Sequence, residues 1–289
     1  MIVRTAVPSD RSTLAVLAAG LQRRPERHVA YLGLDAETIA AEMVAEDDDW
    51  TAVSAVAERD GAPVGWLVGS VDQEIGRVWW FGPFITAEDE GWVAIADALD
   101  AHARALLPAA IDQEELAPDA RFDVLIAWAR AHGFAAESGS AVLTLGGPLP
   151  GPAVEARPLR PDDVDVAALH DRLFPRTHAT GDGLLRDADP DHLRLVVEQD
   201  GTPVGYLAAE RQPDGDGYLD FLGVAEHARR QGWGGELVKA AVAALRALGC
   251  GRVHLTVRET NVAARSLYQG LGFVEERVIA PQRRGFSLD

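Results

Sequence analysis

The sequence is poor in the features that mark secreted and membrane-bound proteins. It contains 1 cysteine, Cys250, so it cannot form an internal disulfide. No apolar run approaches the roughly 18 residues that a membrane-spanning helix needs. The N-terminal segment lacks a basic stretch followed by an apolar core, which excludes a secretory signal of the usual pattern. These absences predict a cytoplasmic protein without a membrane anchor.

Positive charge is also scarce. Lysine and arginine together number 27 against 45 aspartates and glutamates, which gives a formal net charge of −18, and Lys239 is the single lysine. Proteins that bind duplex nucleic acid generally need a basic patch to replace phosphate counterions. We therefore expect neither a nucleic-acid partner nor an anionic membrane surface. The negative charge suits either solubility or the attraction of a cationic acceptor such as an amine.

What remains is an ordinary globular composition of 289 residues, with 47% hydrophobic and 25% charged residues. This length predicts one large domain or two modest ones. An internal repeat favours two. Residues 58–67 (ERDGAPVGWL) resemble residues 198–207 (EQDGTPVGYL) at an offset of 140. Three further matches keep the same order in both halves. Arg4, Pro8 and Asp10 match Arg157, Pro161 and Asp163. Gly91-Trp92 matches Gly232-Trp233, and Gly133-Phe134 matches Gly272-Phe273.

A glycine- and proline-rich stretch, residues 146–152 (GGPLPGP), suits a linker because it cannot sustain a helix or a central strand. We therefore predict domains at residues 1–145 and 153–289. Each half shows a short strand, an amphipathic helix, two strands joined by an Asp-Gly turn, a third apolar strand, a long helix, a strand and a last helix. This order predicts an α+β layered fold made twice, with a mixed, mostly antiparallel sheet flanked by helices.

A second feature is the glycine-rich loop at residues 229–237 (RRQGWGGEL), between an apolar strand and a helix. Successive backbone N–H groups and a helix N-terminus form an anion site there. The loop lacks the Gly-Lys-Ser/Thr ending of a Walker A motif and the third small residue of a Rossmann fingerprint. Downstream, residues 261–273 read NVAARSLYQGLGF.

Together the two stretches resemble the GNAT family of acyl-CoA-dependent N-acyltransferases. Its loop pattern, Arg/Gln-x-x-Gly-x-Gly/Ala, is met by Arg229, Gly232 and Gly234. Its later pattern is met by Asn261, Ala264, Leu267, Tyr268, Gly272 and Phe273. The resemblance covers roughly residues 153–277 directly. The first half is related to the family only indirectly, because its sequence repeats that of the second half.

The resemblance implies acetyl-CoA, or another acyl-CoA, as cofactor. Its pantetheine arm would pair with Leu222, Gly223 and Val224, and its pyrophosphate would take hydrogen bonds from the loop. The implied cofactor-binding loop residues are Arg229, Arg230, Gln231, Gly232, Trp233, Gly234 and Gly235. Asn261 resembles the family's cofactor-contacting asparagine, although an N-cap for the following helix is an equal interpretation. No residue is assigned to a metal.

Tyr268 resembles the family's general acid, which protonates the departing thiolate after direct attack of an amine on the thioester. The alternative is a tyrosine that merely packs on a helix face. No general base carries over, because Thr256 stands where some relatives have a carboxylate. Asp220 is the candidate base, with an exposed strand carboxylate as the alternative, and His254 and His178 are weaker choices. Arg176, His178 and Tyr218 are assigned to the acceptor pocket by position.

The first half lacks this chemistry. Its loop counterpart, residues 88–93 (EDEGWV), carries three carboxylates that would repel a pyrophosphate. Ala129 aligns with Tyr268, and Phe122 aligns with Asn261. We therefore interpret residues 1–145 as a degenerate GNAT-like domain.

These observations predict an acyl-CoA-dependent N-acetyltransferase with one site in the C-terminal half and a small-molecule or peptide amine as acceptor. A mycothiol-synthase-like tandem acetyltransferase and a catalytically silent acyl-CoA sensor are the alternatives. We expect a monomer, because the tandem domains would supply internally the pairing that single-domain relatives obtain by dimerising.

Overall fold

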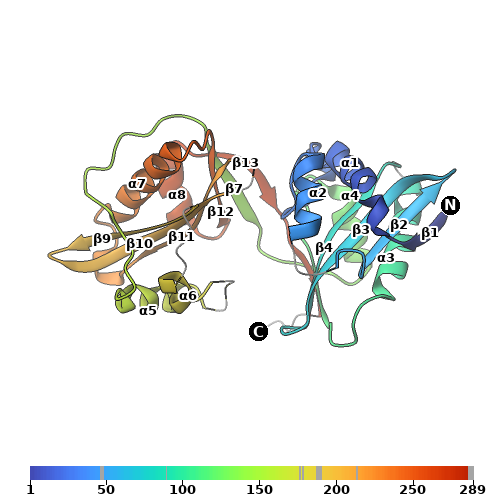
Figure 1. The fold of residues 1–289 in the computed structure, drawn as a ribbon, viewed down its shortest axis with the longest axis horizontal. Coiled ribbons are helices and arrows are strands. Elements are labelled where there is room, and N and C mark those ends of the chain that lie inside the picture. The colour runs from blue at the N-terminus through green and yellow to red at the C-terminus, as the bar shows by residue number, and fades with distance from the viewer. Residues whose placement is uncertain are drawn as a thin grey trace. The chain divides into compact units, whose positions relative to one another are not determined.

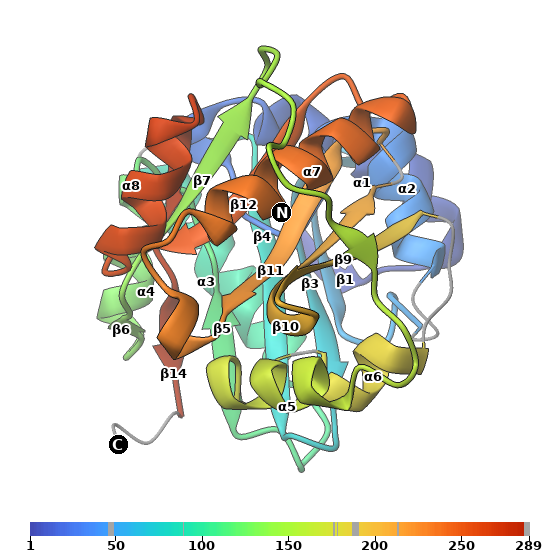
Figure 2. The same cartoon turned by 90° about the vertical axis from the view of Figure 1, so that its left-hand side faces the viewer.

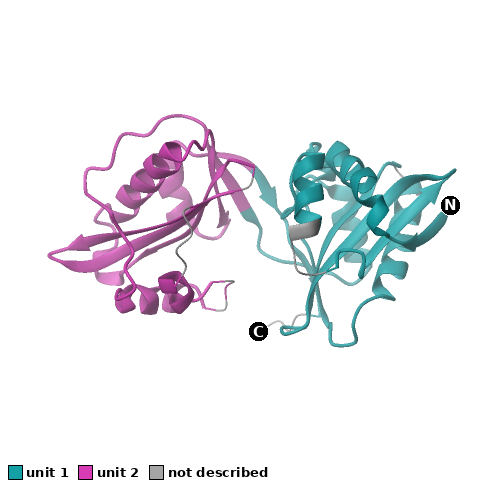
Figure 3. Cartoon of the chain, viewed as in Figure 1, with its two compact units in different colours: residues 1–140, 277–289 teal, residues 141–276 magenta. Residues whose placement is uncertain are grey.

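The computed structural model describes residues 1–45, 49–88, 90–175, 177, 179–186, 191–212 and 214–285. The chain divides into two compact units (Figure 3). Unit 1 comprises residues 1–140 and 277–289, and unit 2 comprises residues 141–276. Each contains a seven-stranded mixed sheet flanked by helices (Figure 1), so the predicted fold class is confirmed.

In unit 1 the elements are β1 (Ile2–Thr5), α1 (Arg11–Gln22), α2 (Ala36–Ala45), β2 (Ser54–Arg59), β3 (Ala62–Asp72), β4 (Arg77–Ile85), α3 (Glu90–Arg104), β5 (Gln113–Leu116), α4 (Asp123–Ala131), β6 (Ala135–Ala136) and β14 (Gln282–Arg284). In unit 2 they are β7 (Ser140–Leu145), β8 (Arg157–Pro158), α5 (Val164–Leu173), α6 (Gly181–Arg186), β9 (His192–Gln199), β10 (Thr202–Arg211), β11 (Gly217–Val224), α7 (Trp233–Ala247), β12 (Val253–Arg258), α8 (Val262–Gly270) and β13 (Val274–Ile279). Among the described residues, no helix is long and apolar enough to cross a bilayer.

The two sheets repeat one another. The strand order is β1-β2-β3-β4-β5-β14-β6 in unit 1 and β8-β9-β10-β11-β12-β7-β13 in unit 2. The central strands pair antiparallel, and one parallel pair in each sheet joins β4 to β5 or β11 to β12. Both predicted Asp-Gly turns form hairpins, at Asp60-Gly61 and Asp200-Gly201, with positive φ at all four residues.

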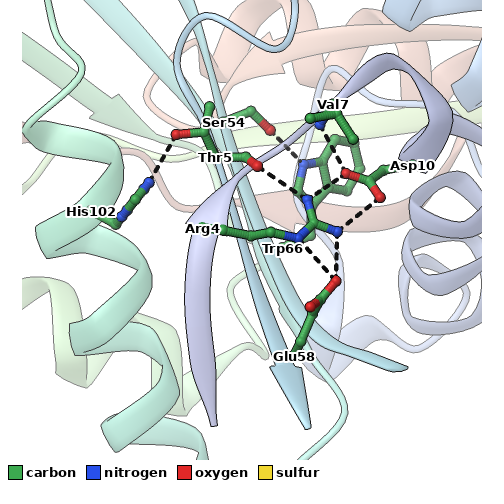
Figure 4. A network of polar contacts seen from close by, with 8 residues as sticks. All are labelled: Arg4, Thr5, Val7, Asp10, Ser54, Glu58, Trp66 and His102. Carbon is green, nitrogen blue, oxygen red and sulfur yellow. Dashed lines mark hydrogen bonds and ion pairs between the residues drawn. The ribbon is translucent and has the colours of Figure 1, made fainter. Parts of the chain in front are cut away.

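A shared ion-pair network explains part of the sequence repeat. In unit 1 the Arg4 guanidinium donates to Asp10, at 2.7 and 2.9 Å, and to Glu58 (Figure 4). In unit 2 Arg157 donates to Asp163, at 2.7 and 2.8 Å, and to Glu198. In both units this network ties the first strand to the turn before the first helix and to the second strand. The arginine hydrogen bonds lower the pKa of both aspartates.

The domain boundaries predicted from the sequence need correction at both ends. β7 closes the first half of the sequence but lies in the sheet of unit 2, between β12 and β13. β14 closes the second half but lies in the sheet of unit 1, between β5 and β6. Each sequence half thus gives its last strand to the other sheet. Residues 146–152 consequently form a loop inside unit 2 and do not separate the units.

Side-chain pairing holds β14 in its sheet. Arg284 donates from Nε and Nη2 to Glu114 at 3.1 and 2.8 Å, and Arg283 donates from Nε to Glu115 at 3.0 Å. Both carboxylates are almost fully buried, at 6% and 4% exposure. Arg104 also donates to Glu114. Two buried carboxylates of unit 1 therefore depend on arginines from the end of the chain.

We expect Arg284→Met to lower the free energy of unfolding of unit 1 by about 2 kcal/mol. Breaking a fully buried ion pair costs roughly 3–5 kcal/mol, and Arg104 still compensates Glu114 in part. Denaturant unfolding followed by tryptophan fluorescence reports on this unit, because six of the seven tryptophans lie in it. Arg24→Met breaks an exposed pair with Glu26 and is the control, with a much smaller expected loss because solvent screens that pair. Equal losses in the two variants would contradict the assigned role of Arg284.

In unit 2 the helices cover both faces of the sheet, with α5 and α6 on one and α7 and α8 on the other (Figures 1 and 2). The residues packed on the α7 side include Leu219, Leu237 and Tyr268. Those packed on the α5 side include Tyr206 and Phe221. The two clusters lie on opposite faces, so β11 presents side chains to both.

Candidate active site

The glycine-rich loop connects β11 to α7 through a short 3-10 turn at Glu226–Ala228. Arg230 and Gly232 both adopt positive φ, at 63° and 95°. Gly232 is the N-cap of α7, and this left-handed conformation is the one that glycine adopts without steric cost. Left-handed residues within such a loop are typical of an anion-binding nest, in which successive N–H groups surround one anion.

Six consecutive backbone N–H groups, from Arg230 to Gly235, donate to no acceptor among the described residues. The first bond of the helix is donated by Glu236 to the carbonyl of Gly232. The buried Nε1 of Trp233 also has no partner within the described part of the chain. These donors, at the positive end of the α7 dipole, fit the pyrophosphate of an acyl-CoA.

Small residues at the start of α7 allow close packing. A Cβ on Gly234 would lie 3.3 Å from Leu267 Cδ2 on α8, and 3.8 and 3.9 Å from Leu222 and Val224 on β11. A Cβ on Gly235 would lie 3.7 Å from Leu267 Cδ1. The loop therefore lies directly against both predicted neighbours of the cofactor, β11 and α8.

The acidic residue in the first turn of α7 is neutralised. Glu236 accepts a hydrogen bond from Lys239 Nζ at 2.8 Å and another from the backbone N–H of Ala153. Both interactions lower the pKa of Glu236. The single lysine of the chain thus compensates the carboxylate nearest to the open donors, which reduces its repulsion of an anion.

β11 and β12 separate next to this loop. Their parallel pairing comprises Gly217 with Val253, Tyr218 with His254, and Leu219 with Leu255. β11 continues to Val224 and β12 to Arg258, but the two pair no further. Beyond Leu219 the edge of β11 is therefore not paired with β12, and at its end the Val224 carbonyl accepts a hydrogen bond from Arg229 Nε at 3.3 Å. Leu222, Gly223 and Val224, predicted to bind the pantetheine arm, lie on this edge.

Helix α8 positions Asn261 and Tyr268. Asn261 Oδ1 accepts the N–H of Ala264 at 3.2 Å, so the N-cap interpretation of this residue holds in the structure. Tyr268 is 7% exposed and stacks edge-on with Phe273 at 5.7 Å. Burial, followed by the charge of Tyr218, raises the pKa of Tyr268 to about 12. The phenol therefore keeps its proton at neutral pH.

Asp220 sits at an irregularity in β11. In β10, Ala208 lies opposite Phe221 and the next residue, Ala209, lies opposite Leu219. Asp220 therefore has no residue opposite it and forms a β-bulge. The side chain lines a cavity of about 330 Å³ with residues of α6, β9 and β10, including Thr180, Glu210 and His192. Regular alternation would place Asp220, Tyr218 and Leu222 on one side. The bulge interrupts this alternation, and Leu222 consequently packs on the α7 side whereas Asp220 lines the cavity on the α6 side.

The equivalent region of unit 1 is filled by aromatic side chains. Trp92 and Phe122 occupy the positions of Trp233 and Asn261 in the repeat, and they are 0% and 1% exposed. Their rings pack edge-on at 5.9 Å, and the Arg27 guanidinium lies 5.7 Å from the centre of the Phe122 ring. Ala129, fully buried, stands in place of Tyr268.

The glycine-rich loop, the divergent ends of β11 and β12 and helix α8 belong to a segment that matches a known protein family. Residues 164–273 match the model of the Acetyltransferase (GNAT) family. Unit 2 carries a GNAT acetyltransferase domain. A mycothiol acetyltransferase from Saccharopolyspora erythraea is 36% identical over 85 residues. That match covers 29% of this chain and 28% of the relative.

Solved structures resemble the whole chain. A GCN5-related N-acetyltransferase from Sphaerobacter thermophilus has a TM-score of 0.73 at 19% identity, covering 98% of this chain and 95% of the other. A tandem GNAT protein from the clavulanic acid biosynthesis pathway has a TM-score of 0.57 at 16% identity, covering 82% and 83%. At such identities the likeness shows the fold, here the tandem GNAT arrangement.

Tyr218 and His254, two further predicted residues of the GNAT domain, lie on β11 and β12. Tyr218 packs against His254, with ring centres 5.2 Å apart. His254 Nε2 is 2.9 Å from Gln212 Oε1, and burial lowers the pKa of this histidine, which disfavours its protonated form. Tyr268 lies in the α7-side cluster, whereas Asp220 lines the α6-side cavity. Arg176 and His178 lie outside the described residues.

Sequence reasoning missed a buried pair beside Asp220. Tyr206 of β10 and His170 of α5 are 2% and 0% exposed. The Tyr206 hydroxyl lies 2.7 Å from His170 Nδ1, and His170 Nε2 lies 3.1 Å from the carbonyl of Ala179. Since that carbonyl can only accept, Nε2 carries a proton and donates to it, and Nδ1 is the atom that pairs with the Tyr206 hydroxyl. The available signal was a histidine on the apolar face of the amphipathic segment 164–173.

We expect Tyr206→Phe to lower the free energy of unfolding by about 1–3 kcal/mol, because it leaves His170 Nδ1 buried without its partner. Thermal unfolding monitored by circular dichroism measures the loss. His170→Phe in the same background supplies the control: it removes the second partner and the bond to the Ala179 carbonyl, which keeps the Thr177 hydroxyl as a donor at 3.1 Å, so the added loss should be small. Additive losses would show that the two groups do not form the pair described.

Proposed function

We propose that the chain is an acyl-CoA-dependent N-acetyltransferase whose single reaction site lies in the GNAT domain of unit 2. The observation that carries the proposal is the set of open N–H donors from Arg230 to Gly235 beside the divergent end of β11. A neutral hydrogen bond contributes about 1 kcal/mol and one to a charged oxygen about twice that. Several such donors acting together suffice for micromolar binding of a CoA pyrophosphate.

Acetyl-CoA supplies the acyl group as a thioester. Leu222, Gly223 and Val224 align the pantetheine arm on the open edge of β11. Tyr268, with its pKa raised to about 12, stays protonated and donates to the departing sulfur. Asp220, on the bulge of β11, accepts the proton of the attacking amine from the cavity side.

The cavity beside Asp220 is the proposed acceptor pocket. Its polar walls include Asp220, Glu210 and Thr180, and Glu210 Oε2 lies 3.1 Å from His192 Nε2. Arg194 also lines this cavity and partly compensates the two carboxylates, so Asp220 is the group proposed to attract a primary amine, either a small molecule or a peptide terminus. A strongly acidic chain, at net charge −18, adds to this attraction.

Unit 1 is proposed to hold no acyl-CoA. The two units share a tryptophan at Trp92 and Trp233, but in unit 1 the buried Phe122 stands where unit 2 has Asn261 and packs against Trp92. No hydroxyl replaces Tyr268, because the equivalent residue is Ala129. The proposal therefore assigns one cofactor site to each chain.

Calorimetric titration of the purified chain with acetyl-CoA tests the cofactor, and thiol release with a panel of primary amines tests the reaction. We expect one saturable site per chain, and turnover with at least one amine. A stoichiometry of two would overturn the degenerate interpretation of unit 1. Absence of binding at millimolar acetyl-CoA would overturn the acyltransferase proposal, whereas binding without turnover of any amine would favour an acyl-CoA sensor.

A second candidate is a mycothiol acetyltransferase-like activity, which the 36% identity over 85 residues to such an enzyme favours. The same thiol-release assay with the acceptor of that enzyme separates the two candidates. Turnover of that acceptor in preference to simple amines would decide for the second.

A further inference from the structure

Unit 1 contains a cavity that the proposed reaction does not use. It has a volume of about 250 Å³ and lies between α2, β3, β4 and the segment from Asp49 to Val53. Its apolar walls include Met43, Trp50, Trp66, Val68 and Phe81. A dry cavity of about 150 Å³ accommodates a benzene ring, so this one has room for about ten non-hydrogen atoms.

The cavity occupies the place of the acceptor pocket in the other unit. At the repeat offset of 140, Val68, Gly69 and Ser70 correspond to Ala208, Ala209 and Glu210. The first three line the unit 1 cavity and the last three line the unit 2 cavity. Unit 1 has thus kept a pocket on this face of its sheet while aromatic side chains fill its cofactor region.

The charged groups of the unit 1 cavity have one sign. Glu42 and Asp49 line it, and the described lining residues include no lysine, arginine or histidine. Glu42 Oε2 accepts the N–H of Gly33 at 2.9 Å, and Asp49 Oδ1 accepts from the backbone and hydroxyl of Thr51 at 3.0 and 2.6 Å. These bonds fix both carboxylates, so the cavity suits a cation.

Aromatic rings also line the cavity and are a second feature that suits a cation. Trp50 and Trp66 meet edge-on with ring centres 6.3 Å apart, and Trp66 is fixed by its bond from Nε1 to Ser54 Oγ at 2.9 Å (Figure 4). Tyr31 lines the cavity although it is 66% exposed, and it adopts a left-handed φ of 67°. Such a conformation is costly for a residue other than glycine and recurs at ligand clamps. Aromatic faces also attract ammonium groups.

We propose that unit 1 binds a small organic ammonium compound with an aromatic or branched apolar body in this cavity. The apolar walls take the body, and Glu42 and Asp49 take the ammonium group. The ligand stays chemically unchanged there, because the proposed acyl-CoA site belongs to the other unit. Binding therefore requires no acetyl-CoA and is separable from turnover.

The test is titration of the full chain, without acetyl-CoA, with phenethylammonium, which has nine non-hydrogen atoms. Calorimetry and tryptophan fluorescence follow binding, since Trp50 and Trp66 line the cavity. We expect saturable binding in the low-millimolar range or tighter. Neutral 2-phenylethanol should bind at least tenfold more weakly, and anionic 3-phenylpropionate should not bind. No saturable binding of phenethylammonium, or equal binding of the three probes, would overturn the proposal.

Variants then locate the site. The double variant Glu42→Gln with Asp49→Asn keeps hydrogen-bond acceptors but removes the charges, and should weaken phenethylammonium binding at least tenfold without affecting 2-phenylethanol. Asp60→Asn, at an exposed hairpin turn of the same unit, is the matched control and should change neither. Val68→Phe, which fills the cavity, should abolish binding of both probes.

A last comparison separates the two cavities. Asp220→Asn combined with Glu210→Gln alters the unit 2 cavity and should leave the unit 1 site intact. Loss of phenethylammonium binding in this variant, with retention in Glu42→Gln/Asp49→Asn, would place the ligand in the acceptor pocket and overturn the proposal. Neither outcome depends on whether the chain transfers an acetyl group.

Discussion

Replacing Gly232 by glutamate is expected to weaken acetyl-CoA binding at least 100-fold. Gly232 caps α7 at a φ of 95°, and the open N–H donors from Arg230 to Gly235 surround it. A side chain at this φ costs roughly 1–2 kcal/mol and shifts the loop. A carboxylate about 4 Å from a phosphate costs roughly 4 kcal/mol more at an effective dielectric of 20. Calorimetric titration with acetyl-CoA measures the loss.

Gly201→Glu is the matched control for this variant. Gly201 has a φ of 76° in the β9–β10 hairpin, and no atom lies within 4 Å of an added Cβ, as is also true of Gly232. The two substitutions therefore add the same strain and the same charge at different places. We expect similar losses of thermal stability but unchanged acetyl-CoA affinity in Gly201→Glu. Equal affinity in both variants would refute the loop as the cofactor site.

Tyr268→Phe is expected to lower kcat at least tenfold while the Kd for acetyl-CoA stays within twofold of the wild-type value. The substitution keeps the ring that packs against Phe273 and removes only the proton that the hydroxyl would donate. Because the pKa of Tyr268 is about 12, loss of this proton should not cause a decline in the wild-type rate between pH 7 and pH 10.

Steady-state kinetics at saturating amine, together with the acetyl-CoA titration, distinguish this outcome from a packing defect. Tyr31→Phe, which removes a hydroxyl from unit 1, controls for tyrosine loss and should leave kcat unchanged. A kcat for Tyr268→Phe equal to that of the wild type would remove the general acid from the proposal. A parallel decline in acetyl-CoA affinity would show that the ring is displaced.

Local patterns predicted the elements well because each depends on neighbours in the sequence. In α7 the buried residues Leu237, Val238 and Ala241 follow the spacing of one helix face, and Gly249, at a φ of 91°, follows the end of the helix. The Asp-Gly pairs predicted both hairpins because glycine and aspartate accept positive φ. The match of Arg4 and Asp10 with Arg157 and Asp163 predicted a repeat, and the structure shows its cause in two equivalent ion-pair networks.

The site was predicted in part. The loop and its glycines could be recognised because an anion nest is built from consecutive residues. The direction of the Asp220 side chain could not, because it depends on a bulge between β10 and β11 that strand alternation does not reveal. The pairing of Tyr206 with His170 was missed for a related reason, since β10 and α5 meet only after the sheet has formed.

The sequence by itself determined the repeated order of helices and strands and the position of the glycine-rich loop, and it predicts that the first half lacks a working copy of that loop. Only the tertiary structure decided which strands share a sheet. The last strand of each half enters the other sheet, because its hydrogen-bonding partners and, for β14, the buried carboxylates Glu114 and Glu115 lie there. This pairing joins strands that are far apart in the sequence, so no local pattern reveals it. Residues 146–152 have the composition of a linker in either arrangement.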